Sequence, residues 1–107
     1  MHDSLFLLTG GMAAMRRLIY FEADWCAACG LYERELLQYL EKHAGKGQIV
    51  RIDVDKEPAL SAYYQVEQIP TIVLQDGQTV VYNGAASLDR VRTLRWLRGG
   101  GDGQGPT

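Results

Sequence analysis

The stretch Phe21-Glu22-Ala23-Asp24-Trp25-Cys26-Ala27-Ala28-Cys29 contains both cysteines of the chain and marks a change in the sequence pattern. Leading into this stretch, Leu18-Ile19-Tyr20-Phe21 is a short run of aliphatic, β-branched and aromatic residues, which predicts a buried strand. From Cys26 to about Ala44, apolar residues recur at helical spacing and polar residues fill the other face, which predicts an amphipathic helix. We therefore expect the cysteines at a junction where a strand leads into a helix.

Two residues separate Cys26 from Cys29, so we expect both sulfurs on the first helical turn, close enough to form a small ring. Unpaired backbone N–H groups and the helix dipole favour negative charge at the start of a helix. This position therefore favours the thiolate of Cys26, which is the nucleophilic form of the side chain. Cys29, one turn deeper, is expected to resolve the mixed disulfide that Cys26 forms. A C-x-x-C pair at such a junction indicates a redox site.

Three other interpretations of the cysteine pair remain open. A zinc site needs four ligands, whereas the sequence has no second cysteine pair and its only histidines are His2 and His43. A static disulfide across so small a ring would stabilise the fold less than a long-range bridge. The pair could also be a redox-inert remnant on a binding module. Over these three alternatives we favour the redox site, which needs no metal and no organic cofactor.

The rest of the chain supplies further strands and helices around this junction. We expect a strand at residues 49–54 and a short helix at 57–65, entered through Pro58. Asp76-Gly77 predicts a hairpin turn between strands at 71–74 and 79–82. We expect a last helix with Ser87 as its N-cap, and four of its apolar side chains are expected to face the core. These are Leu88, Val91, Leu94 and Leu97. The order predicts an α/β fold with a central mixed sheet and helices on both faces.

Length and charge limit the function classes that fit. The chain has 107 residues, which allows one domain at roughly 150 residues per domain. Its 11 Lys and Arg against 13 Asp and Glu give a formal charge of −2, which lacks the basic surface that general nucleic-acid binding requires. No apolar run approaches the roughly 18 residues that span a bilayer. We expect a monomer that binds no nucleic acid and does not insert into a membrane.

The two ends of the chain carry separate expectations. Residues 1–98 are expected to form the domain, and residues 99–107 a flexible tail, because these hold five of the 12 glycines. The start, Met1-His2-Asp3, lacks the basic region of a secretory signal. The sequence as written therefore suggests a cytoplasmic protein, and a periplasmic one if a signal peptide was removed.

Together with Gln68-Ile69-Pro70-Thr71, the Trp25–Cys29 motif resembles the thioredoxin family, and the resemblance covers most of Leu18 to Leu97. Within the family, the motif looks most like the C-terminal thioredoxin-like domain of the periplasmic protein DsbD. The resemblance implies a thioredoxin-like fold and thiol–disulfide exchange on protein disulfides, with an upstream thiol donor that supplies electrons.

The resemblance also implies roles for three residues near the cysteines. Pro70 would be a cis-proline facing the disulfide, at the start of a strand, where its missing N–H is tolerated. The backbone of Ile69 would pair with an incoming peptide strand. Trp25 would shield the cysteines and offer an apolar contact. The plainer alternatives are an ordinary turn proline for Pro70 and a core aromatic for Trp25.

The sequence departs from the family at several charged positions. Thioredoxins usually carry a buried aspartate six residues before the first cysteine, and here that residue is Tyr20. Glu22 faces the same side of the strand, so we hypothesise that it acts as the base toward Cys29, directly or through one water. The alternative is a solvated glutamate. Gly30 replaces a common lysine, and Arg51 is expected either to supply positive charge instead or to be a surface arginine.

Thioredoxins have a full strand and helix before the central strand, whereas only 17 residues precede Leu18 here, so we expect an abbreviated N-terminal unit. We expect a brief edge strand at Leu5 to Leu8 and a helical turn at Met12 to Arg17, with the exposed side of the sheet as a possible partner surface. The last helix carries four arginines that we interpret as a solvated face rather than as a docking site for an acidic partner or membrane. They are Arg90, Arg92, Arg95 and Arg98.

We expect the chain to act as a reductase, since Ala27-Ala28 lacks the histidine common in strongly oxidising relatives. One alternative is a dithiol oxidase or isomerase in an oxidising compartment. Another is a redox-inert adaptor that binds peptides at the Ile69-Pro70 edge.

Overall fold

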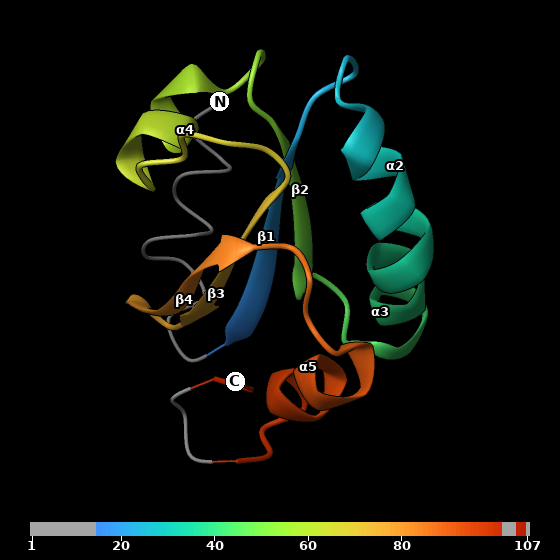
Figure 1. Ribbon diagram of the computed structural model, residues 1–107. Coiled ribbons are helices and arrows are strands. Elements are labelled where there is room, and N and C mark those ends of the chain that lie inside the picture. Colours follow the sequence, from blue (N-terminus) through green and yellow to red (C-terminus); the bar gives the residue numbers. More distant parts are fainter. Residues whose placement is uncertain (1–14, 102–104, 107) are drawn as a thin grey trace.

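The structure is a computed structural model that describes residues 15–101 and 105–106. Its strands are β1 (Arg16–Glu22), β2 (Ile49–Asp53), β3 (Thr71–Asp76) and β4 (Thr79–Ala85). Its helical segments are α2 (Ala27–Tyr32), the π-helical η2 (Glu33–Leu37), α3 (Gln38–His43), α4 (Pro58–Tyr63) and α5 (Arg90–Leu97). Figure 1 shows these elements around one sheet. In the part of the chain described, no helix is both long and apolar enough to cross a membrane.

The described strands form one mixed sheet in the order β2-β1-β3-β4. β1 pairs with β2 in parallel and with β3 antiparallel, and β4 pairs antiparallel with β3. β1 lies inside the sheet, and helices cover both of its faces. Its continuous apolar run, Leu18 to Phe21, is therefore fully buried. The predicted α/β fold with a mixed central sheet is confirmed.

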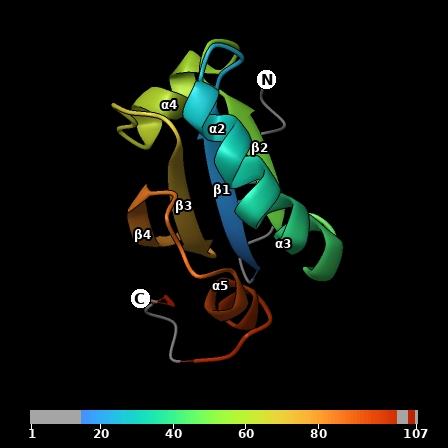
Figure 2. The same cartoon turned by 45° about the vertical axis from the view of Figure 1, so that its right-hand side comes forward.

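Alternate residues of β1 point into two separate hydrophobic cores. Leu18 and Tyr20 pack with residues of α2, η2, α3 and α5, whereas Ile19 and Phe21 pack with α4. In Figure 2 the consecutive helical segments α2, η2 and α3 lie with α5 on one side of the sheet, and α4 lies on the other side. The sheet thus places the end of β1 directly beneath the start of α2, where the two cysteines lie.

The first half of the chain differs from the predicted elements in two details. Arg16 and Arg17 belong to β1 rather than to a helical turn, because they pair with β3. The helix expected from Cys26 to Ala44 is continuous, but its middle turn is π-helical. Leu5 to Leu8 and the first residues of the other expected N-terminal element, 12–14, lie outside the described residues.

The hairpin and the last helix also differ from the predictions. The hairpin turn falls one residue later than expected, with Asp76 still paired in β3 and Gly77 at a φ of 63°. α5 begins at Arg90, and its N-cap is Asp89, whose carboxylate accepts a hydrogen bond from the Arg92 N–H at 2.9 Å. Ser87 is therefore not the cap.

The face that α5 buries is rotated from the predicted one. Leu94 and Leu97 are buried as expected, but Val91 is 52% exposed. Thr93 and Trp96 are buried in its place. The arginines of α5 are exposed, as predicted for a solvated face.

The tail and the domain boundary at residue 98 stay predictions. At the start of the tail, the Arg16 guanidinium donates to the backbone oxygens of Trp96 and Gly100 at 2.8 and 2.9 Å. This contact ties Gly100 to the end of α5 and to β1.

Candidate active site

Cys26 and Cys29 are joined by a disulfide, with their Cα atoms 5.4 Å apart. Cys26 is the N-cap of α2, and its sulfur accepts a hydrogen bond from the Cys29 N–H at 3.2 Å. Cys29 is only 4% exposed, whereas Cys26 is partly exposed. An external sulfur can therefore approach Cys26 more easily than Cys29, which is the asymmetry that a nucleophile and a resolving thiol require.

Two hollows share the segment that leads to Ile69, and each is also lined by a residue next to a cysteine in the sequence, Ala28 or Trp25. The first, of about 450 Å³, is lined by Ala28 and Tyr32 on α2 and by Pro70 and the end of β4. The second, of about 470 Å³, is lined by Trp25 and the segment after α4. Ile69 lines both. Ile69 therefore shares a hollow with Ala28 and another with Trp25, the sequence neighbours of the cysteines.

Ile69 and Pro70 lie just before β3, and the peptide bond between them is cis. The pairing of β3 with β4 begins at Thr71. The backbone of Ile69 thus lies before the first paired residue of β3, where an incoming strand could extend the pairing.

Trp25 is held on the surface rather than in the core. Its side chain is 69% exposed, and its Nε1 donates to Asp55 Oδ2 at 2.9 Å. Asp55 lies in the turn after β2, where its own N–H donates to Asp53 Oδ1 at 2.9 Å. The alternative of a core aromatic is therefore wrong. The sequence resemblance included Asp55 in the aspartate-rich end of this strand but gave it no role, although its place just after β2, which is parallel to β1, is a usable clue.

Arg51 of β2 is the centre of an ion-pair cluster with three glutamates. Its guanidinium makes two hydrogen bonds to the Glu41 carboxylate, at 2.8 and 2.9 Å. Nη1 lies 3.4 Å from Glu33 and 3.7 Å from Glu22. Arg51 is therefore not an isolated surface arginine. Sequence reasoning paired Arg51 with the acid site but missed Glu33, which follows Cys29 by one helical turn and so lies on its side of the helix.

Burial is the largest cause that raises the pKa of Glu22, and the neighbouring carboxylates of Glu33, Asp53 and Asp24 add to the rise. Arg51 opposes the rise, since its positive charge favours the carboxylate. A raised pKa brings a carboxyl group closer to the range in which it accepts and returns protons near neutrality. Among the described residues, Glu22 has an ion pair with Arg51 and no hydrogen bond to Cys29.

The Tyr20 hydroxyl occupies the place beneath Cys29. It is fully buried and donates to the Cys29 carbonyl oxygen at 2.9 Å. Burial is the main cause that raises the pKa of Tyr20 to about 12. The sequence marked Tyr20 only as a departure from the family, because spacing alone does not reveal which atom a buried hydroxyl contacts.

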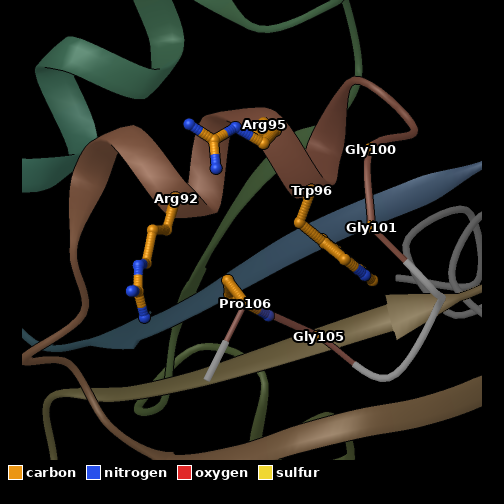
Figure 3. Close-up of a pocket in the computed structure, with 7 residues that line it drawn as sticks. All are labelled: Arg92, Arg95, Trp96, Gly100, Gly101, Gly105 and Pro106. Carbon is orange, nitrogen blue, oxygen red and sulfur yellow. The ribbon is translucent and has the colours of Figure 1, made fainter.

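A third cavity, of about 230 Å³, lies against α5 and is lined by none of the predicted site residues. Figure 3 shows Arg92 and Trp96 extending from α5 toward the segment at Gly105 and Pro106. Within residues 15–101 and 105–106, no three or more His, Cys, Asp or Glu side chains are grouped as metal ligands would be.

Comparison with known proteins identifies the family. The family model described as Thioredoxin matches residues 12–94, so this chain belongs to the thioredoxin family. Thioredoxin of Staphylococcus aureus is 40% identical over 65 residues, which cover 60% of this chain and 62% of that protein. The match thus spans less than two thirds of that relative's length.

Solved structures agree with the fold. Thioredoxin-2, a component of the malaria parasite protein secretion machinery, has a TM-score of 0.68 at 24% identity, covering 84% of this chain and 87% of its own. Mitochondrial thioredoxin 3 of Saccharomyces cerevisiae, in its oxidised form, has a TM-score of 0.68 at 19% identity, covering 92% and 88%. The resemblance to the C-terminal domain of DsbD stays a prediction, since these three relatives are thioredoxins.

Proposed function

We propose that this chain is a thiol–disulfide oxidoreductase that reduces disulfides in other proteins through Cys26 and Cys29. The observation that carries the proposal is a disulfide between a partly exposed and a buried cysteine. Two hollows near it, lined by Ala28 and by Trp25, are both lined by Ile69 as well. Membership of the thioredoxin family supports the same reaction.

In the reduced protein, the Cys26 thiolate attacks one sulfur of a substrate disulfide. The substrate S–S bond breaks, a mixed disulfide with Cys26 forms, and the first substrate sulfur leaves as a thiolate. Cys29 then loses its proton and attacks the sulfur of Cys26, which releases the second substrate thiolate. Two electrons pass to the substrate, and the protein is left with the Cys26–Cys29 disulfide. An external thiol donor must return two electrons before the next cycle.

Substrate recognition would combine backbone pairing with one apolar contact. The backbone of Ile69, just before the paired part of β3, would add a short substrate strand, and Pro70 would face the reacting sulfurs. The exposed indole of Trp25 would cover the bound segment from the other side. Main-chain pairing tolerates many sequences, so the substrates would be protein disulfides of varied sequence.

Glu22 would accept the proton of Cys29 through one water. Its raised pKa and its place on the same face of β1 as Tyr20 support this role. Arg51 would keep enough carboxylate present for the role, because its charge opposes the effect of burial.

The direction of electron flow would be that of a reductase, because Ala27 and Ala28 supply no histidine to stabilise the Cys26 thiolate further. The reduction potential tests this direction. A potential near the roughly −270 mV of thioredoxin supports the reductase, and one near the roughly −120 mV of a strong oxidant supports the oxidase alternative. Reduction of insulin by the reduced protein tests the activity itself, with Cys26→Ser as the inactive control. An adaptor without redox chemistry would leave insulin oxidised.

A further inference from the structure

The backbone of Cys29 makes one hydrogen bond to Tyr20 and another to the sulfur of Cys26. The Cys29 N–H donates to Cys26 Sγ at 3.2 Å. The Cys29 carbonyl oxygen accepts from the Tyr20 hydroxyl at 2.9 Å and also from the backbone N–H of Glu33. One residue therefore connects a buried phenol of β1 with the sulfur that would attack a substrate.

The helix changes its geometry at this contact. α2 ends at Tyr32, and the π-helical turn η2 begins at Glu33, whose N–H shares the Cys29 carbonyl with Tyr20. π-helical turns occur where a helix departs from regular bonding, and they are frequent at functional sites. A side chain that bonds into the helix ladder is one known cause of such a departure.

The hydroxyl of Tyr20 acts as a donor to the Cys29 carbonyl. The burial of Tyr20 and the neighbouring negative charge of Glu22 both raise its pKa, to about 12, so the phenol keeps its proton near neutrality. A carboxylate at this position would repel the carbonyl oxygen of Cys29, whereas a neutral phenol stabilises it. Tyr20 therefore differs in kind from a proton acceptor.

We propose that Tyr20 is a positioning residue: its hydroxyl fixes Cys29 so that the Cys29 N–H points at the sulfur of Cys26 and stabilises the thiolate in the reduced protein. The proposal rests on the proposed function, because it concerns the nucleophile of that reaction. Loss of the hydroxyl would free the Cys29 carbonyl from β1 and leave it bonded only to Glu33. The first turn could then shift, and the N–H would point less well at the thiolate.

The test is the pH dependence of Cys26 alkylation by iodoacetamide in the reduced protein, with the modified cysteine identified by mass spectrometry. For Tyr20→Phe we expect the midpoint to rise by about half a pH unit, which is roughly a threefold loss of thiolate at a fixed lower pH. The charged and titratable side chains nearest Tyr20 are Glu22, Arg51, Glu33 and Tyr32, and the variant retains all four.

Tyr64→Phe is the matched control. Tyr64 is also buried and donates to Gln75 Oε1 at 2.6 Å, but it belongs to the other core, on the α4 side of the sheet. Both variants lose one buried hydrogen bond and some stability. Only Tyr20→Phe should move the midpoint. A chain with 4-aminophenylalanine at position 20 keeps a donor there and should restore the midpoint of the unmodified protein.

An unchanged midpoint in Tyr20→Phe, or an equal rise in Tyr64→Phe, would overturn the positioning role. The proposed function fails separately, if the unmodified reduced protein does not reduce insulin. Alkylation still reports the midpoint of Cys26 in that case, so the two failures are distinguishable.

Discussion

The Arg51 guanidinium lies 3.7 Å from the Glu22 carboxylate, across the parallel pair of β1 and β2. This ion pair belongs to a cluster in which one arginine faces three glutamates. The titration of Glu22 is therefore set by two opposing effects, burial and the charge of Arg51.

Replacing Arg51 should move the titration of Glu22 upward. Arg51 is the cause that lowers the pKa of Glu22, so Arg51→Gln leaves burial and the neighbouring carboxylates to raise it unopposed. Carbon-detected NMR of the Glu22 carboxyl group measures this shift. Arg34→Gln, on the exposed face of η2, is the control. A Glu22 titration that stays in place after loss of Arg51 would show that the ion pair has no electrostatic effect.

Glu22→Gln should slow the resolving step and flatten its pH dependence, since the amide cannot accept the proton of Cys29. General bases commonly contribute 100-fold or more, and a loss of about tenfold or more is expected here. Stopped-flow decay of the mixed disulfide measures the step. Glu35→Gln, an exposed residue of η2, should behave as the unmodified protein. Equal rates and pH profiles for the two variants would leave Glu22 without a role.

The same residue predicts how stability depends on pH. The folded pKa of Glu22 lies above its unfolded value, so the folded state binds more protons in the window between the two. Stability from this group is therefore present at low pH and is lost as the pH rises through that window. Glu22→Gln should be at least as stable as the unmodified protein at pH 7 and should lose that advantage near pH 4. Calorimetry at both pH values checks the sign; a destabilised variant at pH 7 would contradict it.

Asp55 should contribute to substrate binding by holding the Trp25 indole in place. Asp55→Ala removes the acceptor of the 2.9 Å hydrogen bond, and we expect KM for insulin to rise about two- to fivefold with kcat nearly unchanged. Asp55→Asn keeps an acceptor oxygen and serves as the control. A change in kcat alone would mean that Asp55 acts on the chemistry and not on binding.

The N-cap of α5 is Asp89 in the structure, whereas the sequence pattern predicts Ser87. Asp89→Ala should cost about 1 kcal/mol of unfolding free energy, because it removes the acceptor for the Arg92 N–H. Ser87→Ala should be close to neutral. Urea denaturation of both variants measures the difference, and a larger loss for Ser87→Ala would restore the cap expected from the sequence.

Features that depend on local pattern were predictable, and features that depend on tertiary contacts were not. The apolar run of β1 and the spacing of Cys26 and Cys29 placed the strand, the helix and the cysteines correctly. The π-helical turn begins at Glu33, whose N–H shares the Cys29 carbonyl with the Tyr20 hydroxyl of β1, and helical periodicity in the sequence does not reveal such a contact. Val91 has the spacing of a core residue, yet no element covers it enough to bury it.

The residues of the candidate site also fall into those that a local motif indicates and those that only tertiary contacts bring together. The pattern predicted Cys26, Trp25 and Pro70 as site residues, because motifs fix their order along the chain. The clustering of Glu33 and Glu41 around Arg51 requires β2 beside β1 and the helix above both. Such contacts become visible only once the sheet order is known.

In the proposed reaction Cys26 attacks the substrate disulfide and Cys29 resolves the mixed disulfide. The most direct measurement uses reduced Cys29→Ser protein, mixed with a peptide that carries one disulfide and analysed by mass spectrometry. We predict a stable covalent adduct of the peptide on Cys26, which a reductant removes. No adduct under conditions in which the unmodified protein reduces the same peptide, or an adduct that persists in Cys26→Ser protein, would contradict the account.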